Sequence, residues 1–117
     1  MFKKCMKCSE VVYVLDGNSN ITCCNNDMKE LIPNSVDAAR EKHVPNTEVV
    51  NNKIIVTVNH VMDIDHYIEW IALETNDEII IKKLKPGNNA LVEFDYKPNS
   101  KVYSYCNKHG LWYKDII

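Results

Sequence analysis

Four of the five cysteines of this 117-residue chain lie within its first 24 residues, and this cluster limits how the chain can fold. It consists of a Cys-x-x-Cys pair and an adjacent pair: Cys5, Cys8, Cys23 and Cys24. Between the pairs, Val11–Leu15 has β-type residues, Asp16-Gly17-Asn18 is a turn signal, and Ile21-Thr22 leads into the second pair. We therefore predict a hairpin with sulfur at both ends. Because two short strands bury too little apolar surface to be stable alone, a metal ion held by the cysteines would supply the missing stability.

The spacing of these cysteines leaves the identity of the metal open. Zinc, as a structural ion, and iron fit the pattern equally, and unliganded or disulfide-bonded cysteines are the third interpretation. No apolar run approaches the ~20 residues of a membrane helix, and no signal-type apolar segment follows the first residues. We therefore expect a cytoplasmic protein, in whose reducing surroundings clustered cysteines bind metal more often than they form disulfides. Cys23 and Cys24, if their backbone is extended, would point in different directions and distort a tetrahedral site.

A second group of potential ligands lies in the rest of the chain. Cys106 and His109 are three residues apart, which lets one turn hold one metal ion through a soft and a borderline ligand. That mixture suits iron, zinc or copper. The three other histidines each stand beside a predicted turn or strand end: His43, His60 and His66. A single histidine beside a strand is usually a surface residue or a hydrogen-bonded core residue, but four histidines with one cysteine favour a second metal site.

The chain after about residue 33 has the two-residue period of β-strands. Seven runs are separated by polar turns: Glu48–Val50, Lys53–Val58, Tyr67–Thr75, Glu78–Leu84, Ala90–Tyr96, Lys101–Tyr105 and Leu111–Ile117. Asn51-Asn52 between the first two is a hairpin turn candidate. Strands at roughly ten-residue spacing predict an immunoglobulin-like antiparallel β-sandwich. Before them, Pro33-Asn34-Ser35 offers an N-cap for a short helix over Val36–Lys42, which Val44-Pro45 would end.

The fold class that we expect is therefore all-β, in two domains. Residues 1–33 would form a small metal-stapled domain and residues 34–117 the β-sandwich, with one short helix before its strands. Composition agrees with a globular protein, since 45% of the residues are hydrophobic and 26% are charged. The formal net charge is −2 and no basic stripe is present, so we expect no nucleic-acid partner and no membrane partner.

Four stretches resemble the superoxide reductases: Glu41–Pro45, His60, His66–Trp70 and Cys106–Trp112. The cysteines of the first cluster resemble those of the desulforedoxin-like domain of desulfoferrodoxins, the two-iron members of that group, in which a neelaredoxin-like domain follows. The resemblance covers the whole chain in order. It implies a rubredoxin-type tetrahedral iron at the four N-terminal cysteines and a catalytic non-haem iron with four histidine ligands and one axial cysteine thiolate. Those five ligands would be His43, His60, His66, His109 and Cys106.

The resemblance also implies an activity and partners. The protein would reduce superoxide by one electron to hydrogen peroxide, would take electrons from a rubredoxin-type donor, and would be a homodimer. Lys42 would add positive potential and order a proton-donating water, and Glu41 would be the carboxylate that caps the oxidised iron. Because a thiolate stabilises ferric iron and Glu41 would close the open position, the resemblance favours reduction of superoxide over its dismutation.

Three positions depart from the family pattern. Ser9 and Asn25 follow the cysteine pairs where the family usually has glycine, and Val61 follows His60 where it usually has proline. If the first two positions need a positive φ, asparagine tolerates that conformation and serine is strained. Two rival classes stay open at this point: a small electron carrier or zinc-stabilised binding module, and a superoxide dismutase or another non-haem iron oxidase.

Overall fold

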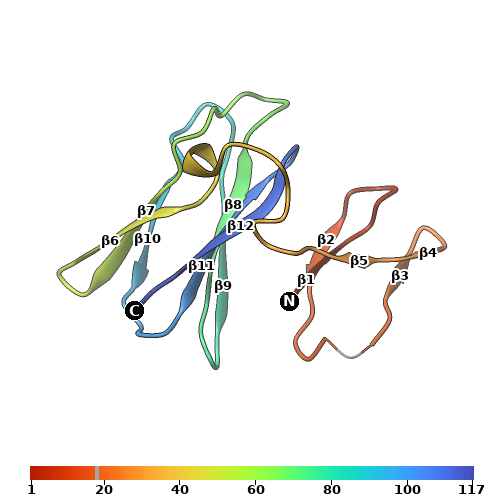
Figure 1. Ribbon diagram of the computed structural model, residues 1–117, viewed down its shortest axis with the longest axis horizontal. Coiled ribbons are helices and arrows are strands. Elements are labelled where there is room, and N and C mark those ends of the chain that lie inside the picture. The colour runs from red at the N-terminus through yellow and green to blue at the C-terminus, as the bar shows by residue number, and fades with distance from the viewer. Residues whose placement is uncertain (18) are drawn as a thin grey trace. The chain divides into compact units, whose positions relative to one another are not determined.

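The computed structural model of the protein describes residues 1–17 and 19–117, so Asn18, part of the predicted turn, lies outside the described residues. The chain divides into two compact units, Met1–Ile32 and Pro33–Ile117. Both are built from antiparallel strands, and the only helix among the described residues is a single 3-10 turn (Figure 1). The predicted all-β fold class is therefore confirmed. No helix in the described ranges is long and apolar enough to cross a membrane.

The first unit contains two small sheets. Its strands are β1 (Phe2–Lys4), β2 (Val11–Tyr13), β3 (Thr22–Cys23), β4 (Asn26–Asp27) and β5 (Lys29–Glu30). One sheet has the order β2-β1-β5, and β3 pairs with β4. The predicted hairpin between Val11–Leu15 and Ile21-Thr22 is therefore wrong, because each run pairs with another partner. The prediction missed β1, whose three residues are too few and too polar to show a strand pattern.

Each cysteine pair lies in the turn of one of these hairpins. Between β1 and β2, the amide of Cys5 donates to the carbonyl of Glu10 at 2.8 Å, and the amide of Ser9 donates to the carbonyl of Cys5 at 2.9 Å. Between β3 and β4, Cys24 and Asn25 have φ values of 52° and 62°. Two consecutive positive φ values are typical of a type I′ turn. Cys23 ends β3, but Cys24 already lies in the turn, so the backbone is not extended through both cysteines, contrary to our expectation.

The second unit is a β-sandwich. One sheet has the order β10-β7-β6 and the other the order β12-β11-β8-β9. Their strands are β6 (Asn46–Val50), β7 (Lys53–Thr57), β8 (Ile68–Glu74), β9 (Ile79–Lys83), β10 (Leu91–Asp95), β11 (Lys101–Cys106) and β12 (Gly110–Asp115). Side chains from both sheets form one buried core, including Ile54 and Phe94 from the first sheet and Leu73 and Val102 from the second. In β7 fully buried positions alternate with less buried ones, as the two-residue period predicts, whereas β11 is buried at every position after Lys101.

Two local predictions for this unit have different outcomes. Asn51 and Asn52 have φ values of 50° and 67° and connect β6 to β7, as the predicted hairpin turn requires. The expected helix over Val36–Lys42 is present only as a 3-10 turn at Arg40–Lys42. Its N-cap is Ala39, which offers no side-chain acceptor, and a helix of seven residues has little intrinsic stability. The rest of the segment is irregular.

Candidate metal centres

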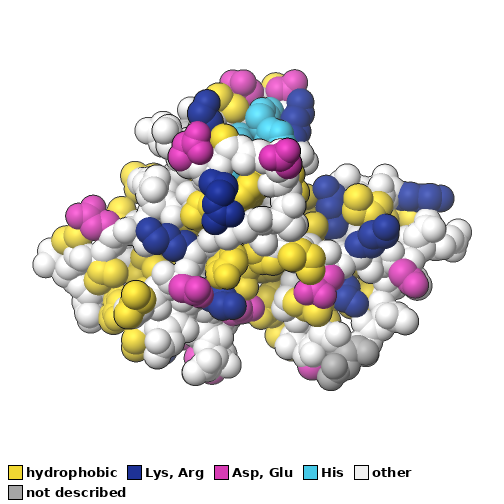
Figure 2. Space-filling model, viewed as in Figure 1, with side chains coloured by type: hydrophobic (Ala, Val, Ile, Leu, Met, Phe, Trp, Pro, Cys, Tyr) yellow, Lys and Arg dark blue, Asp and Glu magenta, His cyan; other side chains and the backbone are white. Residues whose placement is uncertain are grey.

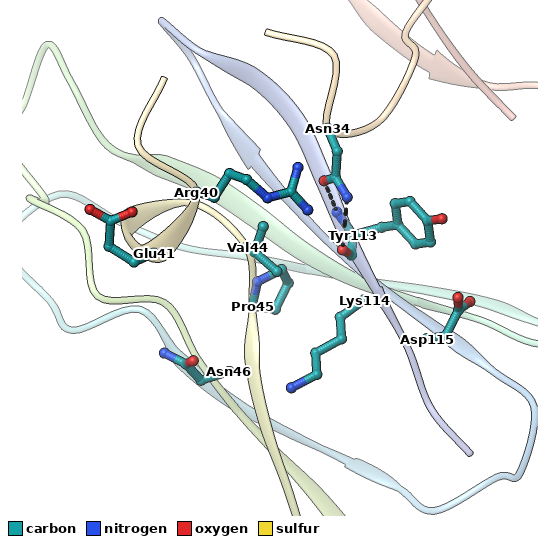
Figure 3. A pocket seen from close by; sticks show the side chains of 9 residues that line it. All are labelled: Asn34, Arg40, Glu41, Val44, Pro45, Asn46, Tyr113, Lys114 and Asp115. Carbon is teal, nitrogen blue, oxygen red and sulfur yellow. Dashed lines mark hydrogen bonds between the residues drawn. The ribbon is translucent and has the colours of Figure 1, made fainter. Parts of the chain in front are cut away.

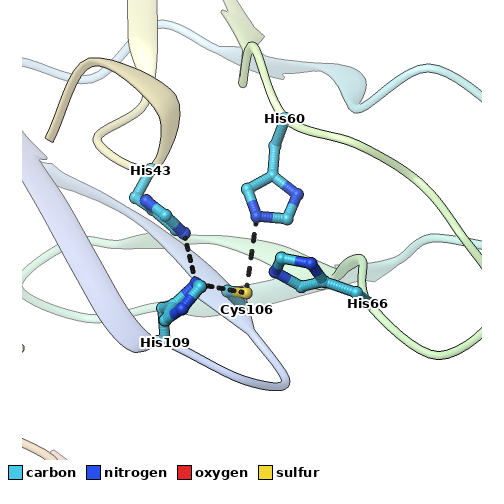
Figure 4. A group of neighbouring side chains, drawn as sticks. All are labelled: His43, His60, His66, Cys106 and His109. Carbon is cyan, nitrogen blue, oxygen red and sulfur yellow. Dashed lines mark hydrogen bonds between the residues drawn. The ribbon is translucent and has the colours of Figure 1, made fainter. Parts of the chain in front are cut away.

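Five side chains converge at one end of the β-sandwich (Figure 4). They come from separate places in the chain: the residue after the 3-10 turn, the two ends of the loop between β7 and β8, the last residue of β11 and the turn before β12. These residues are His43, His60, His66, Cys106 and His109. One ligand atom from each lies within 4.8 Å of all the others. The structure therefore brings together the whole predicted set. Histidine side chains also reach the surface, among acidic and basic side chains (Figure 2).

The ring orientation of two histidines is set by backbone carbonyls. The Nδ1 atom of His43 lies 2.7 Å from the carbonyl oxygen of Ala39, and that of His60 lies 2.5 Å from the carbonyl oxygen of Val61. Since a carbonyl only accepts, each Nδ1 carries the proton and each Nε2 has a free lone pair. These Nε2 atoms face the centre, where they lie 3.1 Å from Nδ1 of His109 and 3.5 Å from Sγ of Cys106, respectively. His109 therefore presents Nδ1.

Burial favours the uncharged forms of three of the histidines and of the cysteine. It is the largest cause that lowers the pKa of His43, His60 and His66, so these imidazoles have lone pairs available near neutral pH. Burial also raises the pKa of the Cys106 thiol, which has no exposed surface, although backbone amides of the following turn lower it in part. A divalent ion would displace that thiol proton and bind a thiolate.

The site has a direct sign of a missing partner. The Nε2 atom of His66 is buried and makes no hydrogen bond among the described residues. Buried polar atoms without a partner are rare in native proteins and require an explanation. A metal ion among four imidazoles and one thiol supplies that partner, so the residues present fit a metal. Mixed nitrogen and sulfur donors suit iron, zinc or copper and not magnesium or calcium.

Three groups around the centre were not identified as supports from the sequence. The Ser104 hydroxyl donates to the carbonyl of His43 at 2.6 Å, inside the core. The indole of Trp112 stacks on the His43 ring at 5.0 Å and donates through Nε1 to the carbonyl of His109 at 3.1 Å. The side chain of Asn107 bonds to the backbone beside His66. The one signal of these supports in the sequence was Ser104, a polar residue between Tyr103 and Tyr105 in a predicted strand.

Glu41 and Lys42 lie beside the centre but do not touch it. Both are exposed on the 3-10 turn that precedes His43, and neither side chain makes a hydrogen bond or ion pair within the described part of the chain. Their charges still reach the site. Burial is the largest cause that lowers the pKa of both His60 and His43. The Lys42 charge lowers the pKa of His60 further, and the Glu41 charge partly raises the pKa of His43. Each residue is therefore close enough to influence the centre electrostatically.

The segment that carries these residues is anchored to β12 through an asparagine. Asn34 accepts a hydrogen bond from the Tyr113 amide at 3.0 Å and donates to the Tyr113 carbonyl at 3.4 Å (Figure 3). A hollow of about 460 Å³ lies here. Its lining residues are Asn34, Arg40, Glu41, Val44, Pro45, Asn46, Tyr113, Lys114 and Asp115. None belongs to the two groups of potential ligands, and the lining includes two basic and two acidic residues, so the hollow lacks a dominant charge.

The four N-terminal cysteines form the second group. Their sulfur atoms lie within 4.8 Å of one another, with 3.6 Å between Cys8 and Cys23 and 3.9 Å between Cys23 and Cys24, and none forms a disulfide. Backbone amides of the first turn lower the pKa of Cys5 to about 6. Hydrogen bonds with neighbouring thiols raise that of Cys23 to about 12. Four sulfur atoms this close together could bind one tetrahedral metal ion.

Comparisons with known proteins agree with one another. The family model described as Desulfoferrodoxin matches residues 35–115. A desulfoferrodoxin of Syntrophotalea carbinolica is 42% identical over 114 residues, covering 93% of this chain and 90% of that protein. One of Clostridium acetobutylicum is 39% identical over 109 residues, covering 90% and 87%. The crystal structure of the superoxide reductase from Treponema pallidum matches with a TM-score of 0.75 and 28% identity, covering 97% of this chain and 98% of that one.

Proposed function

This chain belongs to the desulfoferrodoxin family, and from that premise we propose that it is a superoxide reductase. It transfers one electron to superoxide, which takes up two protons and leaves as hydrogen peroxide. The observation that carries the proposal is the convergence of four imidazoles and one thiol within 4.8 Å, on a fold similar to that of the superoxide reductase from Treponema pallidum.

We assign iron to both groups of ligands. His43, His60, His66, Cys106 and His109 would hold the catalytic iron, and Cys5, Cys8, Cys23 and Cys24 would hold a second one. Iron bound by the histidine-rich group would supply the electron, and the Cys106 thiolate would stabilise its oxidised state. Four thiolates saturate a tetrahedral ion, so the cysteine group has no position for superoxide. The chemistry therefore belongs to the histidine-rich group.

The residues around the catalytic group would attract and protonate the substrate. Four neutral imidazoles and one thiolate offset only one of the two charges of a divalent ion, which leaves about one positive charge for an anion to approach. Lys42 would add to this attraction and order a proton-donating water. Glu41 would be an exchangeable carboxylate ligand after turnover. Its exposed position on the 3-10 turn, two residues before His43, supports that role.

We extend the proposal to domains and partners. Residues 1–33 would be a desulforedoxin-like, rubredoxin-type iron domain and residues 34–117 the superoxide reductase domain. The division into Met1–Ile32 and Pro33–Ile117 supports this, as does a family match that falls within the second unit. A rubredoxin-type protein would supply the electrons, and the chain would act as a cytoplasmic homodimer. Five unpaired cysteines support a reducing location.

The test is to mix the pre-reduced protein with superoxide and to follow hydrogen peroxide and oxygen. Without a donor, we expect one peroxide from the catalytic iron and at most one more from the electron stored on the second iron. We expect no oxygen from the protein, and then no further reaction. Cys106→Ser should abolish the rapid step. Cys8→Ser should retain it, because that residue belongs to the other group. Sustained oxygen release well above spontaneous dismutation would contradict the proposal and indicate a dismutase.

A further inference from the structure

The histidines of the catalytic group are not all held in the same way. His43 and His60 are fixed by hydrogen bonds from their own rings to backbone carbonyls. Neither ring nitrogen of His66 makes a hydrogen bond among the described residues, and its Nε2 is buried without a partner. Metal-bound histidines are normally oriented by a partner on the other ring nitrogen. The ring makes edge contacts with the rings of His60 and His109, at centroid distances of 4.7 and 5.2 Å, but no hydrogen bond of its own fixes its direction. That direction therefore depends on how its backbone is held.

The backbone on both sides of His66 is bonded to one side chain. The Asn107 carboxamide donates through Nδ2 to the carbonyl of Asp65 at 2.9 Å and accepts through Oδ1 from the amide of Tyr67 at 3.0 Å. The amide of Asn107 also donates to the Tyr67 carbonyl at 3.3 Å. Within the loop, a β-bridge between Asp63 and His66 closes the other side. The main chain of His66 and of its two neighbours is therefore held on one side by the Asn107 side chain and on the other by the bridge to Asp63.

The end of β11 explains why a side chain is needed here. The pairing between β8 and β11 shifts near the end of β11. Tyr105 faces Trp70, but the next residue, Cys106, faces Ile68, so one residue of β8 is skipped. Beyond Cys106 the chain turns toward His109, and the backbone pairing is reduced to the bond from the Asn107 amide to the Tyr67 carbonyl. The reciprocal bond from the Tyr67 amide goes to the Asn107 side chain. A carboxamide has the same donor and acceptor groups as a peptide unit. Asn107 thus extends the β8–β11 pairing beyond the strand end by means of its side chain.

We propose that Asn107 is a positioning residue that sets the direction of the His66 ring by clamping the backbone on both sides of it. The clamp connects two parts of the catalytic group, the loop of His66 and the turn that carries Cys106 and His109. An alanine has neither group, and an aspartate lacks the donor for the Asp65 carbonyl. The inference rests on the proposed role of His66 as a metal ligand.

The first measurement uses the metal-free full-length protein and does not depend on activity. In Asn107→Ala, hydrogen exchange of the Tyr67 amide should become a few-fold to about tenfold faster, the effect of losing one ordinary hydrogen bond. Lys108→Ala is the matched control, because this exposed neighbour changes the same turn without touching the clamp. Equal exchange rates in wild type and Asn107→Ala would overturn the proposal.

The second measurement is the affinity of the catalytic group for Fe(II), by anaerobic competition with a chelator. Cys106→Ser removes a ligand of the catalytic group only, so comparison with this variant identifies which of the two irons the chelator removes. Asn107→Ala should weaken binding about 10- to 100-fold, as is typical when a group that orients a ligand is lost. In a His66→Ala background it should have no further effect, because the clamp acts through that ring. An equal loss in both backgrounds would overturn the proposal and assign Asn107 to the turn alone.

The same data separate the two proposals. If His66→Ala binds Fe(II) as tightly as wild type, His66 is not a ligand and the inference fails together with that assignment. If His66→Ala weakens binding and Asn107→Ala does not, only the clamp fails. Asn107→Gln, which keeps the amide one methylene further out, replaces Asn107→Ala if that variant does not fold, and it should change both measurements in the same direction.

Discussion

Replacing Ser104 by alanine should destabilise the β-sandwich and disturb one ligand of the catalytic group. Ser104 lies in β11, has no exposed surface, and donates to the carbonyl of His43 at 2.6 Å. His43 itself is 4% exposed, so water cannot replace the lost donor. The substitution removes a single oxygen atom and opens little space. The loss of folding free energy is therefore that of leaving the buried His43 carbonyl without its hydrogen-bond donor.

That cost is about 1–3 kcal/mol for a buried group left unsatisfied. For a domain of this size, each kcal/mol corresponds to about 4–8 °C in the melting temperature, so we expect Tm to fall by about 5–20 °C. Because the bond fixes the backbone of His43, Fe(II) binding should weaken as well. The assay is thermal unfolding of the metal-free protein, followed by Fe(II) competition with a chelator at a temperature where the variant is folded.

Ser100→Ala is the matched control. Ser100 is also buried, at 1% exposure, and its hydroxyl donates at 2.8 Å to the carbonyl of Lys97 in the turn between β10 and β11. It should lose less stability, because Lys97 is exposed and water can reach its carbonyl, and its Fe(II) affinity should stay unchanged, since that turn contains no ligand. The reasoning is refuted if Ser104→Ala costs less than about 0.5 kcal/mol, the range of an ordinary surface change. It is also refuted if both variants lose Fe(II) affinity equally.

Three further predictions concern charge, strain and protons. Lys42→Ala should slow the reaction of the reduced protein with superoxide about 2- to 10-fold and weaken the dependence of that rate on ionic strength. Lys53→Ala is the control and should change neither, since Lys53 is paired with Asp95 at 2.5 Å on the sheet. Ser9 has a φ of 70°, so Ser9→Gly should stabilise the first unit by about 1 kcal/mol in denaturant titrations, and an unchanged or lower midpoint would contradict this. Burial raises the pKa of the Cys106 thiol and lowers that of His43. Between the histidine and thiol pKa values, Fe(II) binding should release one proton, so the affinity should rise about tenfold per pH unit; a flat profile would argue against a thiolate ligand.

The sequence was more informative about which residues can bind a metal than about which strands pair with each other. Residue type alone identified both groups of potential ligands, because histidine and cysteine donors are few in this chain. Alternation identified the strands of the sandwich, and Asn51-Asn52 identified a turn, because these signals are local. β1 escaped prediction, since three residues cannot show a period. The helix over Val36–Lys42 was overestimated because helix-favouring residues do not compensate for a missing cap.

What only the tertiary structure decided are the supports of the catalytic group. Local pattern could not show that Ser104 reaches a carbonyl 61 residues earlier, or that Asn107 bonds to the backbone on both sides of His66. It also could not show which ring nitrogen each histidine presents, because that depends on carbonyls placed by the turns around it. The sequence by itself determined which atoms can bind a metal. Packing of distant strands determined where those atoms point, because orientation depends on hydrogen bonds that form only once the sheets have assembled.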